Sequence, residues 1–217
     1  GTLMDSMAMW HGMEDELAGR AGHAITEAER AMLHTLTLPE TLAFFHGELG
    51  LGKSEQDVAD MMEDYLMRYY AERSVMRPGA LEFVRELRAR GIRCSIASST
   101  PHAMLVAGCE HTGLAPLVSA IVSTDDVGAS KREPAVYDRA RELMGTPVAA
   151  TWVFEDAAYA LRTLARTDYR TVGIWDQDEA GTFEELSDLA DVAIRSYAEL
   201  DFERFVAGGY ARKAERA

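Results

Sequence analysis

This sequence of 217 residues is poor in cysteine and contains no long apolar run. Its two cysteines, Cys94 and Cys109, form no Cys-x-x-Cys pair and have no pair of histidines beside them, so we expect neither a disulfide framework nor a zinc site. The opening segment lacks the cationic and apolar blocks of a signal peptide, and no stretch is apolar enough to cross a bilayer. We therefore predict a protein of the reducing cytoplasm with no membrane partner.

Positive charge is also scarce, because 22 lysines and arginines stand against 36 aspartates and glutamates, for a formal net charge of −14. Such a surface repels nucleic acid and anionic membranes, which excludes both as expected partners. An anionic ligand has to be held by a few local cations or by a metal, and this favours small ligands over polymers. Nothing in the sequence predicts the oligomeric state.

The distribution of apolar residues predicts two kinds of structure. With 47% hydrophobic residues the chain can bury one full core and carry an inserted subdomain. From Met7 to Ser74 the apolar residues recur at helical spacing, which predicts a bundle of about four helices. After Arg77-Pro78-Gly79 short apolar runs alternate with helical segments, a pattern typical of a parallel α/β sheet.

The α/β part contains five short apolar runs and four intervening helical segments. The predicted strands are 93–97, 120–123, 151–154, 171–174 and 191–194, and the predicted helices are 79–90, 101–112, 134–143 and 157–165. Polar residues follow three of the strands directly. Because the carboxyl ends of parallel strands line the ligand crevice, we expect these polar clusters to converge.

The converging residues together describe a phosphate site. The hydroxyls of Ser98, Ser99 and Thr100 can donate to phosphoryl oxygens, and the ammonium of Lys131 can neutralise them. The acidic pair Glu155-Asp156 can hold a hard cation such as Mg²⁺, which prefers oxygen ligands. Each group also has a simpler structural explanation. The hydroxyls and the acids could cap helices, and the lysine could be a solvated surface charge. Because all of these groups lie at or just beyond strand ends, we favour a phosphate site over the separate structural roles.

In these residues the chain resembles the haloacid dehalogenase superfamily, in the branch with a helical cap inserted after the first motif. That family's first motif reads Asp-x-Asp-Gly-Thr-hydrophobic-x-Asp-Ser, and this chain opens with Gly1-Thr2-Leu3-Met4-Asp5-Ser6. The second motif resembles the run that ends at Ser98, the third falls on Lys131, and the fourth resembles Trp152 to Asp156. The branch includes β-phosphoglucomutase and phosphoglycolate phosphatase.

The resemblance implies a Rossmann-like parallel-sheet core at residues 1–6 and 77–217 and a helical-bundle cap at 7–76. It implies that Ser98 and Lys131 take part in catalysis, and that Glu155 and Asp156 hold Mg²⁺. With the strand-end hydroxyls, the predicted contacts to substrate are Thr2, Ser98, Ser99 and Lys131.

By resemblance, the nucleophilic aspartate lies three residues before Gly1 and the general acid/base immediately before it, so we expect the native chain to be longer. The implied reaction is attack by the aspartate on phosphorus, which gives an aspartyl-phosphate that water hydrolyses. The expected function is a Mg²⁺-dependent phosphatase acting on a small phosphosugar or phosphoacid. A chain that began at Gly1 would lack the nucleophile and be inactive.

This chain departs from the family pattern in several places. The commonest third motif is Gly-Lys-Pro-x-Pro, whereas this chain reads Ser130-Lys131-Arg132-Glu133-Pro134. Ala157 and Ala160 replace the Ser and Gly that often follow the fourth motif. Trp10 stands where the β-phosphoglucomutase branch has a cap histidine, which favours hydrolysis over a mutase reaction.

Two other functions stay open from the sequence. The segment Gly47 to Ser54 satisfies the P-loop pattern G-x-x-x-x-G-K-S, which would make the protein a nucleotide-dependent kinase. A P-loop must follow a buried strand, however, and the residues before Gly47 have a helical pattern. The third hypothesis is a sensor that binds a phosphorylated metabolite in the same pocket without turning it over.

Overall fold

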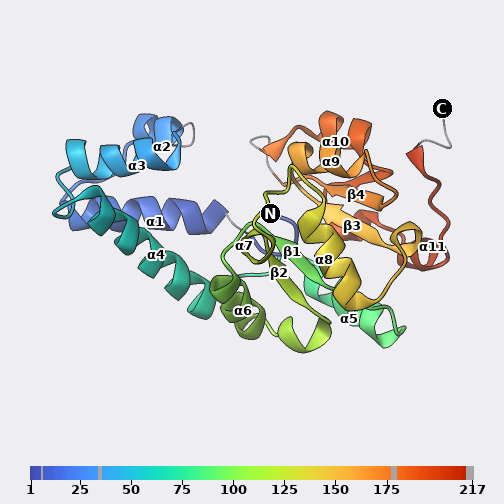
Figure 1. Ribbon diagram of the computed structural model, residues 1–217. Helices are drawn as coiled ribbons and strands as arrows, with labels where there is room; N and C mark the ends of the chain where they lie inside the picture. The colour runs from blue at the N-terminus through green and yellow to red at the C-terminus, as the bar shows by residue number, and fades with distance from the viewer. Residues whose placement is uncertain (6, 34–35, 177–179, 214–217) are drawn as a thin grey trace. The chain divides into compact units, whose positions relative to one another are not determined.

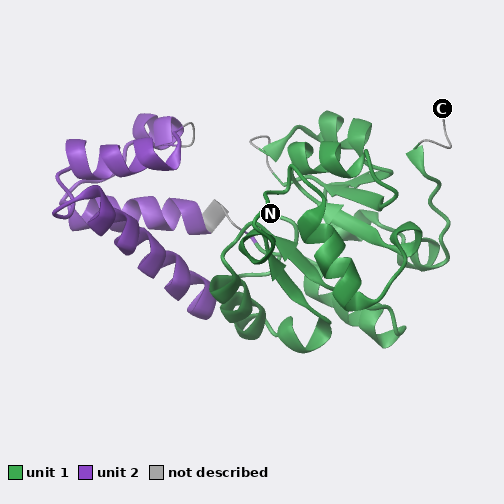
Figure 2. Cartoon of the chain, viewed as in Figure 1, with its two compact units in different colours: residues 1–4, 75–217 green, residues 5–74 purple. Residues whose placement is uncertain are grey.

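The chain forms two compact units in the computed structural model, which describes residues 1–5, 7–33, 36–176 and 180–213 (Figures 1 and 2). One unit comprises residues 1–4 and 75–217, and the other comprises residues 5–74. Each junction lies two residues before the boundary predicted from the sequence. Ser6, at the predicted boundary, is outside the described residues.

The smaller unit is helical. Its helices are α1 (Met7–Arg20), α2 (Glu27–Leu33), α3 (Leu38–Ala43) and α4 (Glu55–Glu72), with a π-helical turn at Phe44–Glu48. The N-cap of helix α4 is Ser54, whose Oγ accepts a hydrogen bond from the backbone N–H of Asp57 at 3.2 Å. The apolar residues of α1 and α4 recur at helical spacing and bury one face of each helix in a shared core.

The P-loop pattern at Gly47 to Ser54 lies in this unit. It does not have the strand-loop-helix structure that a P-loop requires. Helix α3 precedes the pattern, and the first two residues of the pattern, Gly47 and Glu48, belong to the π-helical turn, so among the described residues no strand leads into the glycine-rich segment. The backbone N–H of Lys53 donates to Asp57 Oδ2 at 2.7 Å, so an internal carboxylate occupies the position that a phosphate would need. The structure therefore gives the kinase hypothesis no support.

The larger unit alternates strands and helices, and it confirms the predicted α/β fold class. The strands are β1 (Ile96–Ser98), β2 (Ile121–Ser123), β3 (Trp152–Glu155), β4 (Arg170–Ile174) and β5 (Val192–Ile194). The helices are α5 (Ala80–Ala89), α6 (His102–His111), α7 (Thr124–Val127), α8 (Ala135–Met144), α9 (Ala158–Leu164), α10 (Phe183–Leu189) and α11 (Phe202–Val206).

All strand pairs are parallel, in two sheets of order β1-β2 and β3-β4-β5. Strand β1 begins at Ile96 rather than at the predicted Arg93, because its ladder partner β2 pairs only with residues 96–98. Strand β4 has a paired neighbour on each side and is buried from Thr171 to Ile174, whereas all of β1 and most of β3 are only half-buried.

Helices pack on both faces of these sheets (Figure 1). On β4, Val172 and Ile174 join a cluster with α5 and α11, while Gly173 faces α9 and α10 on the other side. A Cβ at residue 173 would meet Leu186 and Ala190 at 3.2 Å, so the glycine allows α9 and α10 to pack close to the strand. In the described part of the chain, no helix has the length and apolar character needed to cross a membrane.

Phe83 of α5 lies at the centre of an aromatic cluster, with its ring centroid 5.3–5.7 Å from four other rings. These rings belong to Phe154, Tyr197, Phe202 and Phe205. We expect Phe83→Ala to lower the free energy of unfolding by about 3–5 kcal/mol, because it removes buried apolar surface and leaves a cavity. Leu143→Ala, at a side chain that is 48% exposed, is the control and should cost less than about 1 kcal/mol. Urea unfolding followed by circular dichroism measures both, and equal losses would contradict the central role of Phe83.

Candidate active site

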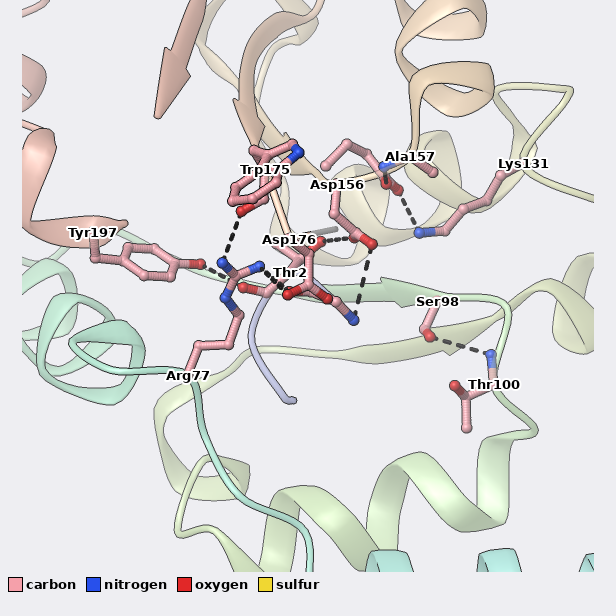
Figure 3. Close-up of polar contacts among 12 residues, drawn as sticks. Thr2, Arg77, Ser98, Thr100, Lys131, Asp156, Ala157, Trp175, Asp176 and Tyr197 are labelled. Carbon is pink, nitrogen blue, oxygen red and sulfur yellow. Dashed lines mark hydrogen bonds and ion pairs between the residues drawn. The ribbon is translucent and has the colours of Figure 1, made fainter. Parts of the chain in front are cut away.

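Polar side chains gather where β1, β3 and β4 end in the larger unit (Figure 3). Strand β1 ends at Ser98, β3 ends at Glu155 with Asp156 following, and Trp175-Asp176 follow β4. Lys131 lies in the loop between α7 and α8. The parallel arrangement puts the carboxyl ends of these strands at one edge, where ligands bind in open α/β sheets.

Lys131 and Glu155 form a buried ion pair at this edge, with side chains that are 11% and 2% exposed. Glu155 Oε1 accepts hydrogen bonds from Lys131 Nζ and from the hydroxyl of Tyr137, the latter at 2.7 Å. Burial opposes the charge on Lys131, but the attraction of Glu155 outweighs it and raises the pKa of Lys131 above its usual value. Lys131 is therefore a fixed, charged ammonium group rather than the solvated surface cation of the alternative reading.

Asp156 is held by the first residues of the chain. Thr2 Oγ1 donates to Asp156 Oδ1 at 2.5 Å, and the amino nitrogen of Gly1 lies 3.9 Å from Asp156 Oδ2. The Asp156 side chain is 20% exposed, so Asp156 is a carboxylate in a mostly enclosed position.

The two acids fit a magnesium ion unequally. Both offer the carboxylate oxygens that Mg²⁺ prefers. Glu155 Oε1 is already occupied by Lys131 and Tyr137, and Glu155 Oε2 has only a long contact of 3.4 Å with the N–H of Ala157. Within the described residues, no group of three or more Asp, Glu, His or Cys side chains is arranged to hold a metal. Each acid has one committed oxygen, and Asp156, with a side chain that is 20% exposed against 2% for Glu155, is the more accessible carboxylate.

Ser98 lies at the end of the neighbouring sheet. Its Oγ accepts a hydrogen bond from the N–H of Thr100 at 3.1 Å, which leaves the hydroxyl proton to be donated to a ligand. The Ser123 hydroxyl donates to the carbonyl of Thr100 at 2.8 Å and so ties this loop to the end of β2. Ser99 is exposed beside it. Among the described residues, no hydrogen bond joins Ser98 or Ser99 to the network around Lys131 and Asp156.

The sequence prediction missed Arg77, which joins three separate segments at this edge (Figure 3). Arg77 Nη1 donates to the carbonyl of Gly1 at 2.6 Å, Nη2 donates to the carbonyl of Trp175 at 2.8 Å, and the guanidinium pairs with Asp176 at 3.4 Å. The Tyr197 hydroxyl donates to the carbonyl of Thr2 at 3.1 Å and fixes the same segment. The position of Asp176 just beyond β4 is a signal that could have been read. No local pattern points to Arg77.

Comparisons with known proteins agree with this geometry. The haloacid dehalogenase-like hydrolase family matches residues 1–167. Protein CbbY of Rhodobacter capsulatus is 31% identical over 153 residues, a match that covers 67% of each chain. The match to the hydrolase family supports the predicted enzyme class, a phosphoric monoester hydrolase.

Solved structures share the fold. A protein from Thermotoga maritima assigned as a β-phosphoglucomutase superposes with a TM-score of 0.80 at 18% identity, covering 95% of this chain and 93% of that one. CbbY from Rhodobacter sphaeroides, in complex with phosphate, superposes with a TM-score of 0.70 at 22% identity, covering 93% and 92%. The chain belongs to the haloacid dehalogenase-like hydrolase family.

Proposed function

We propose that the protein is a Mg²⁺-dependent phosphatase that hydrolyses a small phosphosugar or phosphoacid through an aspartyl-phosphate. The observation that carries the proposal is the buried Lys131–Glu155 pair beside the Asp156 carboxylate at the carboxyl end of β3. This arrangement provides a fixed cation for a phosphoryl group and a carboxylate for a metal. A structure of CbbY from R. sphaeroides with xylulose-1,5-bisphosphate supports a phosphorylated sugar as the kind of substrate.

In this proposal each residue acts on a defined atom. The aspartate expected before Gly1 attacks phosphorus, the bond from phosphorus to the ester oxygen breaks, and the second aspartate gives a proton to the departing alcohol. Lys131 and the Ser98 hydroxyl hold the phosphoryl oxygens, and Ser99 contributes at the same strand end. Thr2 orients Asp156 through their hydrogen bond. Asp156, with Glu155 next to it, would hold Mg²⁺, which would supply positive charge against the phosphoryl group.

Activity is tested on a chain extended at its N-terminus by the Asp-x-Asp of the family motif. We expect phosphate release from a panel of phosphorylated metabolites in Mg²⁺ and none in EDTA, because the aspartate is the nucleophile. The matched control replaces the first added aspartate by asparagine, which keeps the size and removes the carboxylate. Binding of phosphorylated ligands without turnover by the extended chain would favour the sensor hypothesis instead.

Ser98→Ala tests the proposed phosphate donor. Loss of a hydrogen bond to a charged group is worth about 1.5–3 kcal/mol, so we expect affinity for inorganic phosphate to fall by at least about tenfold. Ser119→Ala removes a hydroxyl from an exposed residue before β2 and is the control, with an expected change of less than about threefold. Calorimetric titration with phosphate in Mg²⁺ measures both. An equal loss in the two variants would contradict the assignment of the phosphate donor to Ser98.

Lys131→Met tests the ion pair independently of activity. It leaves the Glu155 carboxylate buried without its cation, so we expect the free energy of unfolding to fall by about 3–5 kcal/mol. The double variant Lys131→Met/Glu155→Gln removes both charges and should recover most of that loss. Lys53→Met, in the helical unit, is the control for losing a lysine. A stability unchanged by Lys131→Met would show that the pair is solvated.

A further inference from the structure

The cations of the candidate site are already matched by carboxylates. Lys131 is paired with Glu155, and Arg77 is paired with Asp176 at 3.4 Å. Asp156 follows Glu155 directly and adds a further acidic group. In a chain of net charge −14, a substrate with more than one anionic group needs an additional cation close to Lys131.

Arg132 is such a cation. It follows Lys131 directly in the loop before α8, it is exposed, and its N–H donates to Ser130 Oγ at 3.3 Å. Its guanidinium carbon lies 5.2 Å from the centroid of the Tyr159 ring. Within the described part of the chain, no carboxylate forms an ion pair with Arg132.

Tyr159 places this cation at the edge of the site. It lies at the start of α9, three residues after Asp156, and its ring is partly exposed. The ring of Tyr159 therefore holds the Arg132 guanidinium close in sequence to both Lys131 and Asp156.

The stacked geometry suits ligand binding. A guanidinium packed on a ring face loses less conformational freedom when it binds than a mobile surface arginine does. The N–H groups of the guanidinium point outward in its own plane, so they can bind a carboxylate or a phosphate in a bidentate manner. The resemblance described above puts proline at this position, so the arginine is a feature of this chain.

We propose that Arg132, held over Tyr159, binds a second anionic group of the substrate and selects phosphorylated metabolites that also carry a carboxylate or a second phosphate. The inference rests on the proposed function, because Lys131 and Ser98 hold the first phosphate. Arg132 is then a specificity-determining residue and leaves the phosphoryl chemistry to Lys131 and Asp156.

Two pairs of ligands test this inference by calorimetric titration in Mg²⁺. Glycerol 3-phosphate and 3-phosphoglycerate differ by a carboxylate, and fructose 6-phosphate and fructose 1,6-bisphosphate differ by a second phosphate. We expect the more highly charged member of at least one pair to bind about fivefold more tightly, the upper range for a partly exposed ion pair. The pair that shows the preference identifies the second group.

Variants assign that preference to the arginine. Arg132→Ala should abolish it and change the affinity for the singly phosphorylated partner by less than about twofold. Tyr159→Leu should weaken it, and Tyr159→Phe, which keeps the ring face, should retain it. Arg166→Ala removes the same charge from the turn between α9 and β4, at the opposite edge of the sheet, and should leave the preference intact.

The outcomes separate this inference from the proposed function. An equal loss for both members of each pair in Arg132→Ala would mean that the residue only attracts anions in general, which overturns the inference. So would the absence of any preference in the unmodified protein. If none of the four ligands binds, the proposed phosphate site fails and the inference fails with it. Binding of the singly phosphorylated ligands that is lost in Lys131→Met/Glu155→Gln, the variant expected to stay folded, would uphold the site whatever Arg132 does.

Discussion

The Glu155 carboxylate is almost completely buried at the end of a strand, and it has to be paired there. An isolated carboxylate in that position would be unstable by several kcal/mol, roughly the margin that keeps a domain folded. Lys131 and Tyr137 supply the pairing from the loop before α8 and from α8 itself. The same contacts fix the ammonium of Lys131 beside Asp156. The requirement to neutralise one buried charge therefore builds the cationic side of the site.

A second group of contacts builds the other side of the site. The first residues of the chain are held by Arg77, Tyr197 and Asp156, which come from three separate segments of the larger unit. Most of these bonds go to backbone carbonyls, so they fix the path of the chain whatever side chains it carries. Backbone contacts thus fix the path of the first residues, while the side chains that can act on a ligand are Asp156 and Lys131.

The sequence predicted the fold well because the fold depends on local patterns. Five apolar runs became five strands, and the four intervening helices lie within about one residue of their predicted limits. The polar residues after β1 and β3 were readable for the same reason. Arg77 was not, since its partners Gly1 and Trp175 lie 76 and 98 positions away in the sequence. Only the folded chain shows that Lys131 is buried by Glu155 and Tyr137, and the catalytic roles of these residues remain predictions.

Gly173 has a consequence for how the site tolerates change. Because the strand has no side chain at this position, α9 and α10 rest almost directly on its backbone. A methyl group there would press on Leu186 and Ala190 at 3.2 Å and meet Leu161 of α9 at 3.4 Å. Helix α9 follows Asp156 and carries Tyr159, so any movement of α9 that relieves these contacts would move one side of the site although none of its own residues had changed. The position of that side therefore depends in part on a glycine in the interior of the sheet.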